Sequence, residues 1–192
     1  SLKNFYIVYN RLGEKDMNIT FIGGGYVGLI SSVGFANLGH NVICVDIDKK
    51  KVELINKGLS PIFEQGLDAA LKKVIRKKLI ATTDIKYAVS NSDFIFITVG
   101  TPSNKDGSVN INFVRKAFLD SIKYSKNYKE IIIKSTVPPG TSELLSKIAY
   151  QKTKKLVYKD YGLAMNPEFL REGRALQDFY NPDRIVIGAN NK

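Results

Sequence analysis

"NITFIGGGYVGL", residues 18–29, contains the most informative structural pattern in this sequence. A short run of β-forming apolar residues leads into glycines with the spacing Gly-x-Gly-x-x-Gly, and apolar residues then recur at helical intervals. In such a strand–turn–helix unit the first glycine permits a tight turn, the second lets a pyrophosphate approach the backbone, and the third lets the helix pack on the strand. Free amide N–H groups at the start of the helix favour phosphate. The pattern predicts dinucleotide contacts at these residues: Gly23, Gly25, Tyr26, Val27 and Gly28.

The second apolar run, NVICVDI at 41–47, places a carboxylate where a dinucleotide fold needs one. Asp46 lies 18 residues after Gly28, close to the usual interval of about 20 to the acidic residue that binds the adenosine ribose. A carboxylate accepts hydrogen bonds from a ribose diol and repels a 2′-phosphate, so Asp46 favours NAD over NADP. Lys49, Lys50 and Lys51 work against this inference, because a lysine can bind a phosphate.

Strand-like and helix-like segments alternate along the rest of the chain. Further strands are expected at 79–84, 93–100, 130–136, 161–167 and 184–188, and helices at 51–58, 66–77, 111–125 and 141–150, the last capped by Thr141 or Ser142. Continuous apolar strands separated by helices indicate a parallel sheet covered on both faces. The predicted fold is therefore α/β, a Rossmann-like doubly wound parallel sheet with helices on both faces. Such sheets bind ligands at the carboxyl ends of their strands.

Composition and charge exclude several classes of protein. The net charge of +11 suits an anionic partner, but the basic residues are scattered and form no nucleic-acid motif, so solvated lysine-rich helix faces are expected and no nucleic acid. No apolar run approaches the roughly 20 residues that span a membrane. We expect no metal site. Residues 1–16 precede Met17, which begins the first strand directly, and are interpreted as an extension without an assigned role.

The single cysteine and the single histidine are both expected to be structural. Cys44 lies inside an apolar strand, where burial raises the pKa of a thiol and suppresses the reactive thiolate. One cysteine forms no internal disulfide, so a reducing cytoplasm is the simplest setting. His40 lies between a helix and a strand and is expected to face solvent.

Later segments resemble the UDP-glucose/GDP-mannose dehydrogenase family. They are GLSPIFEQGL at 58–67, FITVGTPSNKDGSVN at 96–110, IIIKSTVPPGT at 131–141 and MNPEFLREGRALQDFYNPDRIVIG at 165–188. The resemblance covers Met17 to Gly188 in order and is greatest to the branch that acts on UDP-glucose. It implies oxidation of C6 of a nucleotide-linked hexose to a carboxylate with two NAD. In the family a cysteine forms a thiohemiacetal and then a thioester, which water hydrolyses.

The resemblance also implies roles for matching positions. Thr101 and Lys51 would contact the cofactor, with Lys51 near the ribose held by Asp46. Thr136 would lie near the nicotinamide and help to hold the catalytic water. Glu168 would lie near the reacting carbon and the water, and Glu172 near the nicotinamide.

The resemblance also assigns a role to the residues that follow Glu168. Phe169, Leu170 and Arg171 would line the sugar-nucleotide site, partly through backbone groups. A carboxylate serves as the general base of thioester hydrolysis when burial or a like charge raises its affinity for a proton. Spacing alone also fits a surface pair of acids four residues apart, neutralised by Arg171 and Arg174.

The catalytic cysteine of the family, with a lysine and an asparagine on a connecting helix, has no counterpart in this sequence. Residues 17–192 are therefore expected to form an NAD-binding domain that binds NAD without completing the oxidation, while a second domain in cis or trans completes the UDP-sugar site. The complete enzyme is expected to be a homo-oligomer. GDP-mannose or a UDP-N-acetylhexosamine remain alternative substrates. A different NAD-dependent dehydrogenase and a non-catalytic dinucleotide-binding or regulatory module remain alternative functions.

Overall fold

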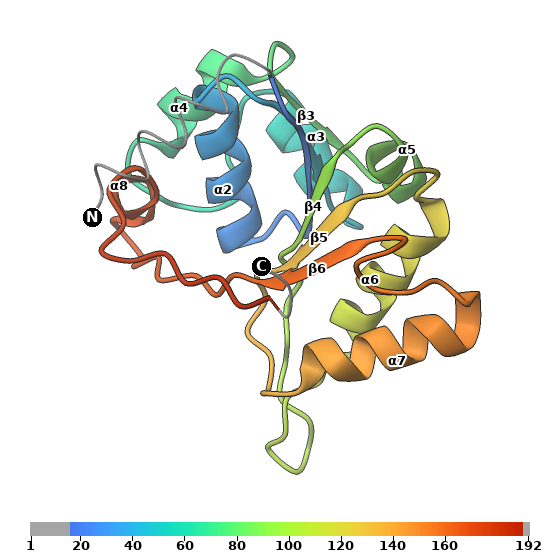
Figure 1. Cartoon of the computed structure of the whole chain (residues 1–192). Coiled ribbons are helices and arrows are strands. Elements are labelled where there is room, and N and C mark those ends of the chain that lie inside the picture. The colour runs from blue at the N-terminus through green and yellow to red at the C-terminus, as the bar shows by residue number, and fades with distance from the viewer. Residues whose placement is uncertain (1–15, 190–192) are drawn as a thin grey trace.

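The computed structural model describes residues 16–189, which form one six-stranded parallel sheet flanked by helices (Figure 1). The strand order is β3-β2-β1-β4-β5-β6, that of doubly wound dinucleotide-binding sheets. The strands are β1 (Asn18–Ile22), β2 (Asn41–Val45), β3 (Leu79–Thr82), β4 (Phe94–Ile97), β5 (Glu130–Ile133) and β6 (Gly162–Met165). Successive strands are added to one side of β1 up to β3 and to its other side from β4 onwards, so the loops that leave β1 and β4 diverge and open a crevice at their carboxyl ends. The predicted Rossmann-like sheet is confirmed. The extension expected at residues 1–16 lies outside the described residues except for Asp16.

Seven helices connect or follow the strands in the described residues. They are α2 (Tyr26–Asn37), α3 (Lys49–Asn56), α4 (Leu67–Val74), α5 (Ile85–Ser90), α6 (Asn112–Tyr124), α7 (Thr141–Thr153) and α8 (Ala175–Tyr180). The short helices α5 and α8 were not expected from the sequence. None of the helices between residues 16 and 189 has the length and apolar character to cross a membrane.

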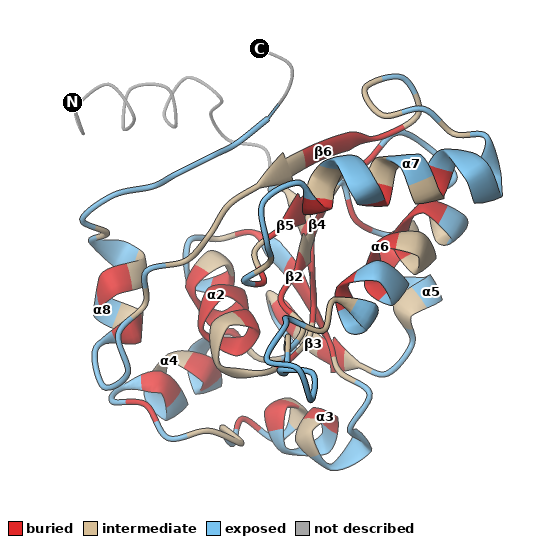
Figure 2. Ribbon diagram, turned by 90° about the horizontal axis from the view of Figure 1, so that it is seen from below, coloured by how far each residue is buried: buried red, intermediate tan, exposed pale blue. Residues whose placement is uncertain are grey.

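Alternation along the strands sends side chains into two separate cores. On β4, Phe94 and Phe96 face the core formed with α2, α3 and α4, whereas Ile95 and Ile97 face the core formed with α6 and α7. Phe21 of β1 stacks on Phe96 at 4.8 Å between ring centroids. Buried residues lie on the side of each helix that faces the sheet, and α2 is buried around most of its circumference (Figure 2). The predicted coverage of both faces is therefore present.

Helix α8 packs closely on α2 because α2 carries a glycine there. A Cβ atom on Gly34 would lie 2.3 Å from Cε1 of Phe179, so any side chain at position 34 would displace the α8 ring. Phe179 also meets Phe35 edge-on, at 5.3 Å between centroids. This contact fixes the far end of the segment that follows β6 against the helix that follows β1.

Three local expectations are wrong. Residues 184–188 form no strand: the chain meets β6 only at the bridge between Met165 and Gly188, and the side chains of Ile185, Val186 and Ile187 stay exposed, so no burial supports a longer pairing. The cap of α7 is Gly140 in a left-handed conformation, at φ +82°. The Thr141 hydroxyl instead donates to the carbonyl of Pro138.

His40 is buried, at 8% exposure, rather than facing solvent. The end of α2 explains the difference: Gly39 takes φ +102°, and the N–H of His40 bonds the carbonyl of Phe35, five residues earlier. This glycine-ended helix turn folds the imidazole back onto the Phe35 ring. Nδ1 of His40 accepts the N–H of Met17, and burial lowers the pKa of the imidazole.

Candidate cofactor and catalytic site

The glycine-rich turn between β1 and α2 is held by backbone packing. Gly23 has φ +111°, and a Cβ there would lie 2.6 Å from the carbonyl oxygen of Thr98. A Cβ on Gly28 would lie 1.8 Å from the carbonyl oxygen of Gly23. A Cβ on Gly25 would meet nothing within 4 Å, so the outer side of the turn is open. These contacts fit the predicted division of labour: two glycines allow close packing and the middle one leaves room for a ligand.

The N-terminus of α2 is suited to a phosphate. Its N-cap residue, Gly25, makes no side-chain cap hydrogen bond, and the first turn contains no acidic residue. The unshielded end of the helix dipole and its first N–H groups therefore attract an anion. Val27 lies in this first turn, beside Tyr26. A pyrophosphate group fits a site with these donors and open space at Gly25.

Asp46 lies half-exposed at the end of β2, facing the same turn. Its Oδ2 accepts the N–H of Gly24 and its Oδ1 accepts the N–H of Asp48, both at 2.9 Å. Each carboxylate oxygen retains a further lone pair, so both can still accept a hydrogen bond from a ribose hydroxyl. Lys51 follows in α3, whose N-cap residue is Asp48. The glycine-rich turn thus orients Asp46, which is predicted to bind the ribose of the dinucleotide held at that turn.

Two buried hydroxyls join the carboxyl ends of adjacent strands. The Thr98 hydroxyl donates to the carbonyls of Ile22, at 3.1 Å, and Gly23, at 2.9 Å. The Ser135 hydroxyl reaches the carbonyls of Ile97 and Val99 at 3.2 and 2.8 Å. Neither residue was predicted from the sequence, although a polar residue just after an apolar strand signals such a role. Their neighbours, half-buried Thr101 and exposed Thr136, open onto the same edge of the sheet.

Glu168 and Glu172 do not form a surface ladder. The segment from Asn166 to Arg171 is irregular, and a turn follows at residues 172–174. Oε2 of half-buried Glu168 accepts the N–H of Leu170 at 2.5 Å, whereas Glu172 is exposed. Within the described residues neither acid forms an ion pair with Arg171 or Arg174. The helical salt-bridge interpretation is therefore wrong for this segment.

Arg171 is engaged by α8 rather than pointing freely into the site. Asp178 accepts the Arg171 N–H and Nε at 3.0 Å each and Nη2 at 2.6 Å. These bonds lower the pKa of Asp178 to about 2. Leu170 packs on the α2 core, while Phe169 is 49% exposed beneath the Arg184 guanidinium, which lies 5.3 Å from its ring centroid. Of the three predicted substrate residues, Phe169 and Arg171 have exposed side chains, and that of Arg171 is bonded to Asp178.

Lys134, which the sequence analysis missed, lies at the end of β5 close to Glu168. Its Nζ donates to Oδ1 of Asn166 at 3.1 Å. Burial lowers the pKa of Lys134, and the charge of Glu168 opposes that shift. The lysine therefore brings a positive charge towards the carboxylate predicted to act on the water. A lysine placed directly after the apolar run EIII was the available signal.

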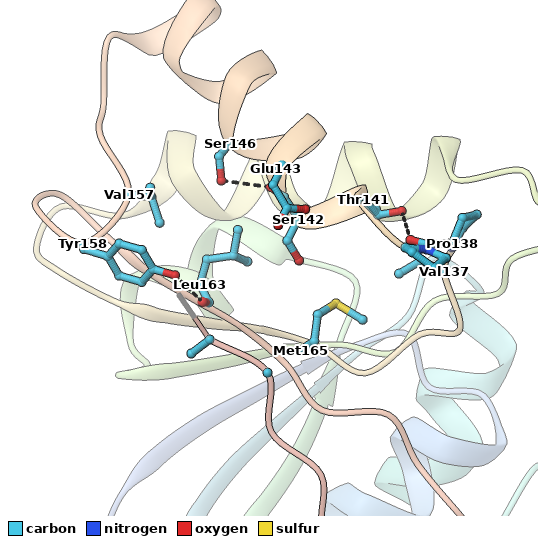
Figure 3. A pocket seen from close by; sticks show the side chains of 14 residues that line it. Val137, Pro138, Thr141, Ser142, Glu143, Ser146, Val157, Tyr158, Leu163 and Met165 are labelled. Atoms are coloured by element: carbon cyan, nitrogen blue, oxygen red, sulfur yellow. Dashed lines mark hydrogen bonds between the residues drawn. The ribbon is translucent and has the colours of Figure 1, made fainter. Parts of the chain in front are cut away.

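A cavity lies to one side of these residues. It measures about 380 Å³ and lies between the loop Val137–Gly140, the start of α7 and the end of β6 (Figure 3). Tyr158 and Leu163 are joined across it by a hydrogen bond from the phenol to the carbonyl. The cavity begins one residue after Thr136 but contains neither the glycine turn nor the two acids.

Cys44 contributes no nucleophile to this site. Its thiol is buried, and burial raises its pKa to about 12, as the sequence analysis expected. No group of acidic, histidine and cysteine residues between positions 16 and 189 could hold a metal ion.

An open glycine turn, an uncapped helix and an acidic residue ending the next strand define a class: the dinucleotide-binding domains. Comparison with known proteins narrows it. Residues 17–192 match the UDP-glucose/GDP-mannose dehydrogenase family, NAD binding domain. The UDP-glucose 6-dehydrogenase of Rickettsia conorii is 46% identical over 177 residues, covering 92% of this chain and 40% of that protein.

Solved structures agree with this match. The GDP-mannose dehydrogenase of Pseudomonas aeruginosa has a TM-score of 0.87 and 37% identity, covering 91% of this chain and 41% of that one. The UDP-glucose dehydrogenase of Pyrobaculum islandicum has a TM-score of 0.86 and 38% identity, covering 93% and 42%. The chain belongs to the UDP-glucose/GDP-mannose dehydrogenase family and comprises its NAD-binding domain. NAD is its cofactor, and the chain spans about two fifths of the length of these relatives.

Proposed function

We propose that this chain supplies the cofactor half of an enzyme that oxidises C6 of UDP-glucose to UDP-glucuronate. The observation that carries the proposal is a contact between two regions. They are the acidic segment, residues 166–174, and the cofactor turn, the glycine-rich residues 23–28 where β1 leads into α2. The Tyr26 hydroxyl, at the start of α2, lies 3.5 Å from the carbonyl oxygen of Arg171, between Glu168 and Glu172. The predicted acids are thus held at the edge of the sheet where the nicotinamide nucleotide binds.

Each side chain has a distinct role in this proposal. Bound NAD supplies the hydride acceptor. The turn at Gly25 binds the pyrophosphate, and Asp46 binds the adenosine ribose with Lys51 nearby. Thr101 contacts the cofactor from the end of β4.

The remaining residues act on the substrate side. Thr136 and Glu168 hold the water that hydrolyses the thioester, with Glu168 as the general base and the positive charge of Lys134 close to it. Glu172 lies towards the nicotinamide. Phe169, Leu170 and Arg171 border the sugar nucleotide, through backbone groups where their side chains are engaged.

The nucleophile and most of the substrate site come from another part of the enzyme. The only cysteine in this sequence, Cys44, is buried and its pKa is raised to about 12, so it forms no thioester. We therefore propose that the chain alone binds NAD and does not complete the oxidation. The 37% identity to a GDP-mannose dehydrogenase makes GDP-mannose the second candidate substrate.

The cofactor part of the proposal is tested by calorimetric titration of the whole chain with NAD and NADP. We expect the native chain to bind NAD more tightly than NADP. Asp46→Asn should weaken NAD binding about tenfold and reduce the difference in affinity between NAD and NADP, because a charged acceptor is lost. Asp93→Asn, an exposed acid just before β4 at the amino ends of the strands, is the matched control. Equal or tighter binding of NADP by the native chain contradicts the proposal.

The catalytic part requires the complete enzyme. Glu168→Gln in that enzyme slows thioester hydrolysis, so the acyl intermediate accumulates and turnover falls by about 10²–10⁴-fold, the range of general-base catalysis. Unchanged turnover removes Glu168 from the mechanism and favours a non-catalytic dinucleotide module. Sustained NADH formation from UDP-glucose by the 192-residue chain alone rejects the two-part site.

A further inference from the structure

The loop between α3 and α4 exposes one residue and buries its charged neighbour. Phe63 is 95% exposed, whereas Glu64 is only 6% exposed. Oε2 of Glu64 accepts the Tyr26 hydroxyl at 2.5 Å and the N–H of Gly173 at 2.9 Å, and Oε1 accepts the N–H of Ala175 at 3.0 Å. One carboxylate therefore bonds two segments that lie far from it, and from each other, in the sequence.

Neutral donors alone satisfy this buried charge. Within the described residues no lysine or arginine pairs with Glu64, and its partners are one hydroxyl and two backbone amides. Burying a carboxylate is costly unless its hydrogen bonds are complete, so the burial of Glu64 is favourable only while all these donors stay in place. The arrangement is thus sensitive to movement of either segment.

We propose that Glu64 is a positioning residue for the acidic segment, residues 166–174, and that Tyr26 couples this segment to the cofactor turn. The proposal rests on the proposed function, which makes Glu168 and Glu172 the acids of the site. Glu64 acts through the amides of Gly173 and Ala175, which lie just beyond Glu172. A nucleotide that orders the turn at Gly25 then also orders the acidic segment, and by linkage the ordered segment favours the nucleotide.

The position of Tyr26 makes it suited to this coupling. It follows Gly25 directly as the first residue of α2, so movement of the turn moves its ring. Its hydroxyl bonds Glu64 and also lies 3.5 Å from the carbonyl oxygen of Arg171. Burial and the neighbouring Glu64 raise the pKa of Tyr26, so the phenol remains a donor throughout the working pH range.

Hydrogen exchange of the whole chain, with and without NAD, tests the proposal on Glu64→Gln. Glutamine retains the volume but turns an NH₂ group towards an N–H or the phenol, so at least one bond is lost. Without NAD, we expect amides at 171–175 to exchange about tenfold faster than in the native chain. NAD protects both residues 25–29 and 171–175 in the native chain but only residues 25–29 in the variant. Glu53→Gln, an exposed acid on α3, behaves as the native chain does.

Three outcomes overturn the inference. Exchange at 171–175 equal to that of Glu53→Gln shows that Glu64 does not hold the segment. Parallel acceleration in β1 and β4 shows a general role in stability rather than positioning. A retained NAD response at 171–175 in Glu64→Gln shows that the coupling runs elsewhere. Failure of the proposed function is separate, because it appears as absence of NAD protection at 25–29 in the native chain.

Tyr26→Phe decides the question if Glu64→Gln fails to fold. This variant removes one oxygen and leaves Glu64 bonded to both amides. We expect the NAD response at 171–175 to fall at least threefold, whereas Tyr87→Phe, an exposed tyrosine on α5, leaves it unchanged. An equal response in the two tyrosine variants rejects the coupling through Tyr26.

Discussion

The cofactor turn and the acidic segment meet at one edge of the sheet but are built differently. The turn is held by contacts of its own backbone and of adjacent strands, such as Gly28 against Gly23 and the Thr98 hydroxyl on Gly23. The acidic segment has no regular secondary structure and is held by two carboxylates from other elements, Glu64 and Asp178. Close packing therefore specifies the first region, and individual hydrogen bonds specify the second.

Gly28→Ala tests the packed region most severely. Its Cβ would lie 1.8 Å from a backbone oxygen that cannot move without shifting β1. We expect the free energy of unfolding to fall by about 3 kcal/mol or more, the upper range for overpacking. Urea unfolding followed by circular dichroism measures it. A loss below about 1 kcal/mol would show that the turn relaxes around the methyl group and is not closely packed.

Gly25→Ala separates binding from folding in the same turn. Here the added Cβ meets nothing within 4 Å, and the residue has φ −75°, which alanine adopts. We expect the variant to lose less than about 1 kcal/mol of stability as an N-cap change. NAD affinity should nevertheless fall about tenfold, because the methyl group occupies the approach of the pyrophosphate. Unchanged affinity in a calorimetric titration would place the phosphates elsewhere.

The contrast between the two regions also explains what the sequence could predict. The glycine spacing, Asp46 and the alternation of apolar strands and helices are local patterns, and the sheet with its main helices followed from them. Helices α5 and α8 are only six residues each and depend on tertiary packing, as Phe179 against Gly34 shows. The strand expected at 184–188 did not form because its apolar side chains find no core to pack against: Ile185, Val186 and Ile187 are exposed, and the segment touches β6 at a single bridge.

The supports of the acidic segment were hidden for a similar reason. Glu64 and Gly173 are 109 positions apart, and no periodicity connects them. The motif at 166–174 indicated which acids to examine, but it gave no sign that Arg171 would bond Asp178 rather than an acid of the site. Lys134 is the exception, because an ionisable residue at the end of an apolar parallel strand points to the ligand edge.

The pair of Arg171 and Asp178 makes the second region sensitive to acid. Because folding lowers the pKa of Asp178 to about 2, its stabilising contribution is complete above the unfolded pKa of about 4 and is lost as pH falls through about 2. Asp178→Asn should therefore unfold more easily than the native chain at pH 6, and this difference should shrink steadily between pH 4 and pH 2. Asp183→Asn, an exposed acid in no described ion pair, should show no such trend. A constant difference across this range would mean that Asp178 acts by packing rather than by charge.

Removing the ion pair between Lys116 and Asp120 on α6 should cause the smallest loss of stability, against which the larger losses can be compared. The pair joins two residues of one helix at 2.7 Å, with the lysine side chain 75% exposed. Such pairs contribute about 0.3–0.5 kcal/mol, and salt screens them. Lys116→Ala should lower the free energy of unfolding by that amount at low salt and by less at 1 M salt, without altering exchange at 171–175. A larger loss of stability, or faster exchange in the acidic segment, would show that surface charge on α6 affects the site. The acidic segment would then not depend only on the carboxylates of Glu64 and Asp178, and the contrast between the two regions would fail.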